Sequence, residues 1–402
     1  MDHVADAPRV AAPTRRLIAL LIVYAALGQL GVNLILPVLP MMAADLGIAG
    51  DRSGLILSTF LIGFGAGQVA AGPLSDRFGR RRTLLAGLLL FTAATLVALT
   101  ASSFALLIVA RIAEGLGASA AFVTSRAVAR DLFDGPGLTR VLGLLTGAMA
   151  ITPGLAPALG GLIGDHMGWR ATQAFLALAG IVLLALTWRG LRETNPYPLR
   201  SLSPIGLARL YGRVVRSRAF ITNAGPNALS LAALYAYFGG APSVFVGKLG
   251  LSMTAFGFLP LVNALAYAAG AALAAFVVGR VRPSRFAAVA LGLMLAGAGS
   301  ALLQGLAGVV TVPGYMTAMG IFSLGLGAML PVGVQGALTP FAREAGTASA
   351  LLGAMQMIAG ALGSSLVGNL PLPVDIGFPL VMIASLLGAV WLTALRPAGA
   401  GR

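Results

Sequence analysis

The sequence predicts an all-α polytopic membrane protein with twelve transmembrane helices arranged in two six-helix bundles. Of its 402 residues, 58% are hydrophobic and only 10% are charged, whereas a soluble domain carries about 25% charged residues. The apolar residues fall in runs of about 20, the length at which a helix crosses a bilayer. A membrane barrel would instead alternate polar and apolar residues. The 54 glycines suit close packing of helices in lipid.

The positive charge of the chain is concentrated in alternate loops. Of the 27 Lys and Arg residues, 23 fall on one side of the predicted topology, in the two terminal tails and every second loop. This bias places both termini in the cytoplasm of a bacterial inner membrane. The net charge of +15 therefore indicates attraction to an anionic lipid bilayer and no nucleic acid partner.

The apolar runs place the twelve spans in order along the chain. Their predicted positions are 17–43, 54–75, 83–101, 104–128, 141–164, 171–189, 219–246, 254–279, 286–308, 313–339, 345–369 and 376–396. The longest polar stretch lies near the middle of the sequence and divides the spans into two halves. We therefore expect a cytoplasmic tail, an N-terminal bundle, a cytoplasmic linker, a C-terminal bundle and a second cytoplasmic tail, at residues 1–14, 15–189, 190–218, 219–396 and 397–402.

A charged stretch separates the second and third runs and reads Gly72-Pro-Leu-Ser-Asp76-Arg77-Phe-Gly79-Arg80-Arg-Arg. Gly72 would let one helix end approach its neighbour closely, and Gly79 can take a positive φ in a turn. Asp76 can pair with an arginine or cap backbone donors. An ordinary positively charged loop would explain the arginines but not the spacing of the two glycines and the aspartate.

This stretch resembles the loop signature of the major facilitator superfamily, Gly-x-x-x-Asp-Arg-x-Gly-Arg-Arg/Lys-x. The resemblance implies roles in conformational gating for the five residues named above. It also implies two bundles with a substrate site between them near the middle of the membrane, and alternating access by rocking of one bundle against the other.

The fifth span contains two prolines four residues apart, Pro153 and Pro157, followed by Gly160 and Gly161. Prolines kink a helix and glycines permit tight packing against a neighbour. The segment resembles the antiporter signature of drug-exporting facilitators, which implies a role in sealing the path across the membrane. The alternative is a proline-kinked packing helix with no directional role.

Two ionisable residues, Arg111 and Glu114, lie three apart in the fourth span and therefore on one helix face. Charges inside a membrane are expensive, which favours a functional role. With the glycines that follow, they resemble the Arg-x-x-x-Gly-x-Gly pattern of the family. We expect Glu114 to bind the coupling proton and Arg111 to tune it; a static ion pair that joins helices is the alternative.

The first span carries Gln29, Asn33 and a Leu-Pro-Val-Leu-Pro segment up to Pro40. Residues 33–40 resemble the Asp-x-x-Leu-Pro-x-x-Pro motif of the bicyclomycin and chloramphenicol/florfenicol exporter branch, in which the aspartate faces the cavity. Asn33 stands where that branch has an acid, which argues against the branch's usual cation or proton site. Arg130 and Asp131 resemble its Arg-Asp-x-Tyr motif. With Arg126 and Asp76 they would form a charge lock at the cytoplasmic side.

The C-terminal half offers neutral polar and aromatic residues to a substrate cavity. Each alone is more often a hydrogen bond between helices, but together with Gln29 and Asn33 they suggest a polar-lined, aromatic cavity. The candidates are Asn223, Asn227, Tyr235, Asn263, Tyr267, Gln335 and Gln356.

These patterns predict a secondary active transporter that exports small amphipathic drugs or metabolites by proton antiport, in the drug:proton antiporter group. We expect a monomer that needs no cofactor besides the coupling proton. The chain contains no cysteine, and no nucleotide-binding loop, metal cluster or nucleophile–base pair is present in its sequence, so we expect no enzymatic activity. An uptake symporter or uniporter of a small neutral or anionic solute is the main alternative, and a non-transporting membrane receptor is another.

Overall fold

The computed structural model describes residues 15–48, 53–195, 204–277, 280–281 and 283–395. In the first half of the chain, the first span is interrupted and five continuous helices follow it. These elements are α1 (Arg15–Asn33), η1 (Leu36–Val38), α2 (Leu39–Asp45), α3 (Gly54–Phe78), α4 (Arg80–Leu99), α5 (Phe104–Leu132), α6 (Gly135–Met167) and α7 (Trp169–Gly190).

The second half repeats this pattern after one short additional helix. Its elements are α8 (Pro204–Arg216), α9 (Arg218–Pro242), η3 (Ser243–Lys248), α10 (Met253–Val277), α11 (Pro283–Leu306), α12 (Val312–Leu338), η4 (Thr339–Glu344), α13 (Ala345–Val367) and α14 (Val374–Ala394). Twelve stretches in the described part of the chain are long and apolar enough to cross a membrane. Each overlaps one predicted span, which confirms the predicted fold class.

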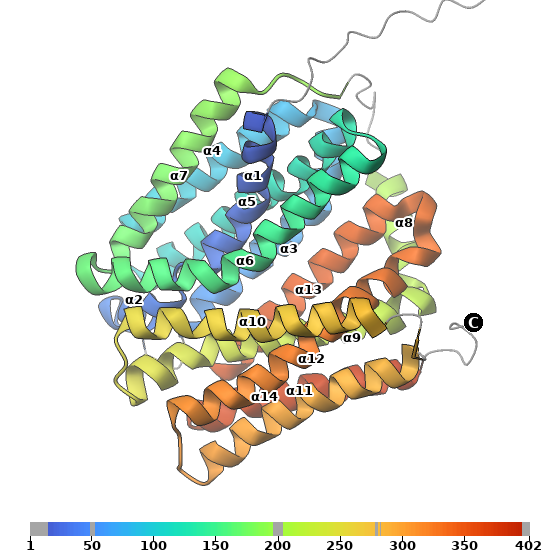
Figure 1. The fold of residues 1–402 in the computed structure, drawn as a ribbon. Coiled ribbons are helices and arrows are strands. Elements are labelled where there is room, and N and C mark those ends of the chain that lie inside the picture. Colours follow the sequence, from blue (N-terminus) through green and yellow to red (C-terminus); the bar gives the residue numbers. More distant parts are fainter. Residues whose placement is uncertain (1–14, 49–52, 196–203, 278–279, 282, 396–402) are drawn as a thin grey trace, which may run out of the picture.

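Each half packs as a bundle, and the two bundles use equivalent contacts (Figure 1). In the first bundle, α5 packs against α1, α3 and α4, and α4 packs against α7. In the second, α12 packs against α9, α10 and α11, and α11 packs against α14. The bundles meet where α3 packs against α13 and where α6 packs against α10. By position within its half, α3 corresponds to α10 and α6 corresponds to α13, so the two contacts are equivalent. The two halves of the chain therefore have equivalent arrangements in space.

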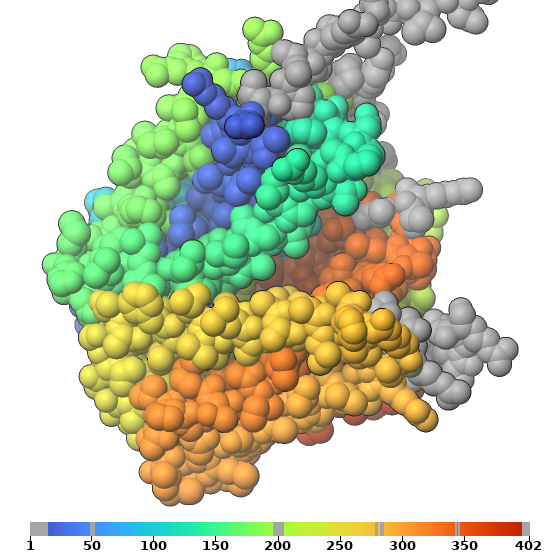
Figure 2. Space-filling model, in the orientation of Figure 1, coloured from blue at the N-terminus to red at the C-terminus, as the bar shows by residue number. Residues whose placement is uncertain are grey.

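The two ends of the molecule differ in how closely the bundles approach. We call the end that carries the start of α4 and the α8 helix the arginine-rich end. At the opposite end the Ser364 hydroxyl donates to the Gly54 carbonyl at 3.0 Å, and the Asp165 carboxylate accepts the amides of Met253 (3.1 Å) and Thr254 (2.7 Å). Toward the arginine-rich end α6 and α10 diverge, and Figure 2 shows a hollow between them with α13 at its floor. The bundles are therefore closed at one end and open at the other.

The stretch 190–218, predicted as a cytoplasmic linker, contains the helix α8, which the sequence patterns did not predict. In α8, apolar residues recur at helical spacing between arginines, the pattern of an amphipathic helix. Val214 is buried against the C-terminal bundle, and the Tyr211 hydroxyl donates to the Val69 carbonyl of α3 at 3.0 Å. The helix α8 therefore contacts both bundles.

Candidate functional site

The predicted ion pair of α5 is present and entirely buried. The side chains of Arg111 and Glu114 form an ion pair, and both are 0% exposed. Arg111 also donates to the Gly31 carbonyl of α1 at 2.9 Å and to the Ile56 carbonyl of α3 at 3.4 Å. Its guanidinium lies over the Phe60 ring, 4.5 Å from the ring centroid. One arginine thus joins three helices of the N-terminal bundle.

The carboxylate of Glu114 is only half satisfied. One oxygen, Oε2, accepts from Arg111, whereas Oε1 has no hydrogen-bond donor within the described part of the chain. The hydroxyl of Thr95 lies beside the carboxylate but donates to the Phe91 carbonyl at 2.7 Å. An unpaired buried carboxylate oxygen is costly, and a proton on it would lower that cost. The site can therefore bind a proton.

The predicted first-span residues lie at the end of α1, two residues on either side of the Gly31 carbonyl that accepts from Arg111. Asn33 is the last residue of α1 and is 1% exposed. Its amide nitrogen donates to the backbone carbonyl of Gln29 at 2.7 Å and to the Gln29 side chain at 3.2 Å. Its amide oxygen has no donor in the described residues. Since Arg111 holds the carbonyl of Gly31, the ion pair is coupled directly to the last turn of α1.

The glycines predicted in the fifth span allow close packing at the interruption of the first span and against the other bundle. A Cβ at Gly160 would lie 1.8 Å from the Leu34 carbonyl oxygen, and one at Gly161 would lie 2.1 Å from the Met253 carbonyl oxygen of α10. Pro157 is buried, whereas Pro153 is half-buried. The α6 helix therefore contacts the interrupted first span with one glycine and the other bundle with the next.

The charged stretch between α3 and α4 is almost entirely helical, and its turn consists of Gly79 alone. Gly79 has φ +94°, which confirms the predicted positive φ. Arg80, the first residue of α4, pairs with Asp76 and with Asp131 of α5, at 2.9 Å for Asp131. Three helix ends are thereby joined at the arginine-rich end.

Glu193, which the sequence patterns did not single out, completes this cluster. Its carboxylate accepts the amides of Arg80 at 2.7 Å and Arg81 at 3.1 Å, and so caps the start of α4. A Cβ at Gly79 would lie 2.3 Å from Glu193 Oε2. The only signal in the sequence is an acidic residue three positions past the end of α7. Its position does not indicate which helix end it would cap.

Several predicted gating residues lie outside the ion-pair cluster. Arg126 stacks over the Phe122 ring at 4.4 Å, and its guanidinium lies 3.7 Å from the Met149 sulfur. Arg130 donates to the Arg126 carbonyl at 3.4 Å, and Arg77 stacks over Phe78 at 5.1 Å. Asp76 and Asp131 pair with Arg80 instead, because Arg80 stands at the start of α4 and faces both aspartates.

The expected close approach at Gly72 is wrong for this conformation. A Cβ at Gly72 would meet no atom within 4 Å. The reason is its position near the arginine-rich end of α3, where the bundles diverge.

One predicted cavity residue of α9, Asn227, joins this helix to two neighbours. Asn227 is 0% exposed, donates to the Leu330 carbonyl of α12 at 3.1 Å and accepts from Gln356 of α13 at 3.2 Å. These two hydrogen bonds connect helices, which is the alternative role considered for such residues. Asn223 instead donates to the Ala219 carbonyl within α9 at 2.9 Å.

The other predicted cavity residues are distributed unevenly. Asn263 of α10 is buried, its nitrogen lies 3.4 Å from the Tyr237 hydroxyl, and its oxygen has no donor in the described residues. Tyr235 is 4% exposed, with its ring 5.7 Å from that of Phe238. Tyr267 is half-buried, whereas Gln335 is exposed near the open end. Tyr237 was missed because nothing in its local sequence distinguishes it from a packing residue.

The sequence is similar to proteins linked by name to drug resistance. It is 30% identical to a chloramphenicol resistance protein of Pseudomonas aeruginosa, over 93% of this chain and 88% of that protein. It is 31% identical to multidrug resistance protein D of Escherichia coli K12, over 94% of this chain and 95% of that protein. These relatives agree with the predicted resemblance to drug-exporting facilitators.

The fold is shared with solved transporters of low sequence identity. A bacterial homologue of the human lysosomal transporter Spinster, in an inward-facing and unoccupied conformation, matches with a TM-score of 0.75 and 14% identity, over 94% of this chain and 95% of that one. The peptide transporter POT in complex with sulfate matches with a TM-score of 0.75 and 19% identity, over 96% and 94%. The family model of the Major Facilitator Superfamily matches residues 21–364. This chain therefore belongs to the Major Facilitator Superfamily of membrane transporters.

Proposed function

We propose that this transporter exports small, uncharged amphipathic compounds in exchange for protons. The observation that carries the proposal is the buried pair of Arg111 and Glu114, with one carboxylate oxygen of Glu114 unpartnered. An ion pair kept only to join helices would gain from full hydrogen bonding of both partners. The names of two relatives, a chloramphenicol resistance protein and a multidrug resistance protein, support drugs as the substrate class.

Proton binding at Glu114 would change the contacts of Arg111. A protonated Glu114 no longer attracts the guanidinium strongly, so Arg111 would bind more firmly to the Gly31 carbonyl of α1. That carbonyl lies in the last turn of α1, next to Asn33. Protonation would thus change the contacts of the interrupted first span, which packs against the Gly160 face of α6. In this way one proton could bias the approach of the bundles.

The proposed substrate lies between the bundles, near Asn33 and the Asn263–Tyr237 contact. The amide oxygens of Asn33 and Asn263 have no donor among the described residues. They offer acceptors to a hydroxyl or amide of a substrate, and Tyr235 and Tyr267 add aromatic surface. Because Asn33 replaces an acid, this lining suits a neutral compound better than a cation.

The proposed orientation places the arginine-rich end in the cytoplasm, with both termini and the 190–218 linker. The hollow then opens to the cytoplasm, and the contacts of Asp165 and Ser364 close the opposite side. The Arg80 cluster, with Gly72, Arg77, Arg126 and Arg130 nearby, lies at the mouth of the hollow and would act in gating. A monomer in the bacterial inner membrane suffices for this cycle.

The test measures chloramphenicol flux in proteoliposomes under an imposed pH gradient. Substitution of Glu114 by Gln keeps the size and hydrogen-bonding shape of the side chain but removes its ability to bind a proton. We expect gradient-driven flux to be abolished, because Gln cannot take up or release the coupling proton. Exchange of labelled for unlabelled chloramphenicol without a gradient should remain measurable. The matched control is Glu344→Gln, since the Glu344 side chain is 35% exposed at the end of η4.

Three outcomes would contradict the proposal. Undiminished gradient-driven flux in Glu114→Gln would remove Glu114 as the proton site. Flux in the same direction as the proton gradient would instead identify an uptake symporter, and gradient-independent flux in the wild type would identify a uniporter.

A further inference from the structure

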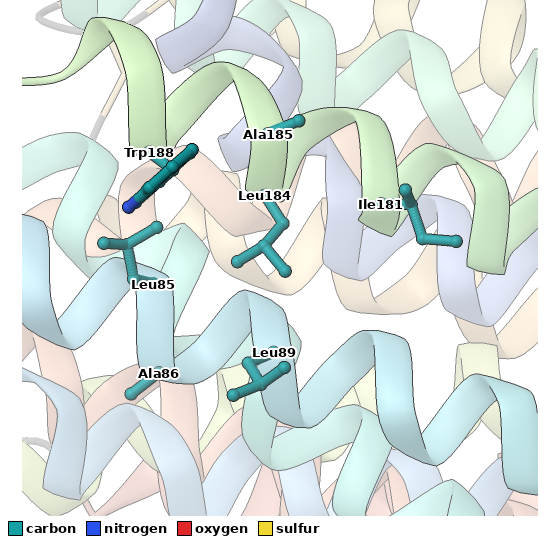
Figure 3. Close-up of a pocket in the computed structure, with 7 residues that line it drawn as sticks. All are labelled: Leu85, Ala86, Leu89, Ile181, Leu184, Ala185 and Trp188. Carbon is teal, nitrogen blue, oxygen red and sulfur yellow. The ribbon is translucent and has the colours of Figure 1, made fainter.

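The outer face of the N-terminal bundle carries an apolar groove between α4 and α7. The groove has a volume of about 470 Å³ and is lined by Leu85, Ala86 and Leu89 of α4 and by Ile181, Leu184 and Trp188 of α7, together with Ala185 (Figure 3). Trp188 stands at one end of the groove, above Leu85. No charged or polar side chain besides the indole N–H lines it. The groove therefore accepts a hydrocarbon chain.

A second, basic pocket begins where the groove ends. It has a volume of about 610 Å³, and Trp188 lines both cavities. Five arginines surround it, Arg77, Arg81, Arg82, Arg189 and Arg192, and the one acidic residue in its wall is Glu193. The two cavities thus adjoin at Trp188, the first apolar along the helices and the second positively charged at the arginine-rich end.

The positive charge of this pocket is not neutralised by Glu193. That carboxylate accepts four backbone amides, those of Arg80, Arg81, Thr194 and Asn195, at 2.7 to 3.1 Å. The side chain of Arg81 donates to the carbonyls of Leu191 and Trp188, both at 2.8 Å. Both groups are therefore occupied in capping helix ends.

Three arginines of the pocket remain available to a ligand. Arg82, Arg189 and Arg192 are exposed, and none of them pairs with a carboxylate within 4.0 Å in the described part of the chain. They come from the first turn of α4, the last turn of α7 and the segment after it. A guanidinium donates two parallel hydrogen bonds to a phosphate, so the pocket is suited to a phosphate group.

We propose that the groove and the pocket together bind one anionic phospholipid. An acyl chain would lie in the groove, the indole of Trp188 at the level of the glycerol backbone, and the phosphate and an anionic headgroup among the three arginines. Basic pockets between helices bind anionic lipid headgroups, and tryptophan is enriched at this depth of a bilayer. A zwitterionic lipid would bring a cation into a pocket whose charge is already positive, so it would bind less well.

The test compares lipid retention by native mass spectrometry of the full-length protein in detergent. We would add phosphatidylglycerol or phosphatidylcholine and remove it stepwise. The wild type should retain one phosphatidylglycerol about tenfold more strongly than one phosphatidylcholine. The triple variant R82Q/R189Q/R192Q should lose this preference, because it removes the three positive charges that attract the anionic headgroup.

Two further variants distinguish lipid binding at this site from general electrostatic attraction of anionic lipid to the protein. The control R15Q/R140Q/R285Q removes the same charge from exposed arginines outside the pocket and should keep the preference. The variant A185F fills the groove and leaves the arginines in place, so it should also lose the retained lipid. Thermal midpoints without added lipid would establish that each variant is folded, and phosphatidylglycerol should raise the midpoint only where it binds. Equal loss in both triple variants, or full retention in A185F, would overturn the proposal.

Discussion

An arginine keeps its positive charge even when it is buried, so Arg111 needs partners in every conformation of the protein. It has them on three sides, a carboxylate, two carbonyls and the face of an aromatic ring. Glu114 is in a different position, because a carboxylate can take up a proton when its partner moves away. In the proposed proton exchange, this asymmetry would make Glu114 the switching member of the pair and Arg111 the constant one.

Gly79 shows how strongly one residue can determine a turn. Its φ of +94° with ψ 157° is a backbone conformation reserved for glycine, and a Cβ there would meet Glu193 at 2.3 Å. We expect Gly79→Ala to lower stability by about 1–3 kcal/mol. Gly72→Ala is the matched control within the same stretch, since its Cβ would meet no atom within 4 Å and alanine favours the helix.

The measurement is the thermal midpoint of each purified variant in detergent. A clear decrease is expected for Gly79→Ala and no decrease for Gly72→Ala. Equal midpoints for both variants would mean that the turn can be made without a glycine.

At the scale of elements, α6 is a helix that contacts both the interrupted first span and the other bundle. Its Gly160 meets the Leu34 carbonyl of the interrupted first span, and its Gly161 meets the Met253 carbonyl of the other bundle. In the first half of the helix, a Cβ at Gly147 would meet no atom within 4 Å. The second half of α6 is thus tightly packed at its glycines, whereas Gly147 in the first half has room for a methyl group.

This difference predicts different results for the same glycine-to-alanine substitution at two positions of α6. Gly160→Ala places a Cβ 1.8 Å from a backbone oxygen, which cannot move without displacing the first span. Overpacking of this kind costs about 1–3 kcal/mol, and we expect a lower thermal midpoint and reduced chloramphenicol flux in proteoliposomes. Gly147→Ala should leave the midpoint unchanged. A normal midpoint and normal flux in Gly160→Ala would show that the contact with the first span is dispensable.

At the scale of the whole molecule, two equivalent bundles meet through α3 against α13 and α6 against α10. The polar contacts described at the closed end are a hydroxyl to a carbonyl and one carboxylate to two amides. They lie beside close packing of α6 against α10, where Gly161 meets the Met253 carbonyl. The arrangement is therefore compatible with rocking about the middle of the membrane.

The charge bias of the loops predicts the orientation of this molecule. Reporter fusions after residues 80, 135 and 200 should report a cytoplasmic position, because the basic segments near them resist translocation. Fusions after residues 50, 100 and 166 should report a periplasmic position. The measurement is the activity of a phosphatase reporter that folds only outside the cytoplasm. The inverse pattern would contradict the twelve-span orientation.

The sequence alone determined the membrane class, the order of the spans and the family signature. Each depends on local properties, namely the length of apolar runs, the side on which arginines collect and the spacing of Gly72, Asp76 and Gly79. It also identified Arg111 and Glu114 as a pair, because a spacing of three residues brings side chains together within any helix.

Only the tertiary structure decided which residues meet across helices. Glu193 caps α4 from 113 residues away, and Asp165 caps α10 from 88 residues away. Gly72 has no neighbour because the bundles are open at its end, whereas Gly160 is tightly packed because the first span breaks beside it. Such contacts depend on where distant helix ends come to lie, and that is set by the packing of all twelve spans together rather than by any local pattern.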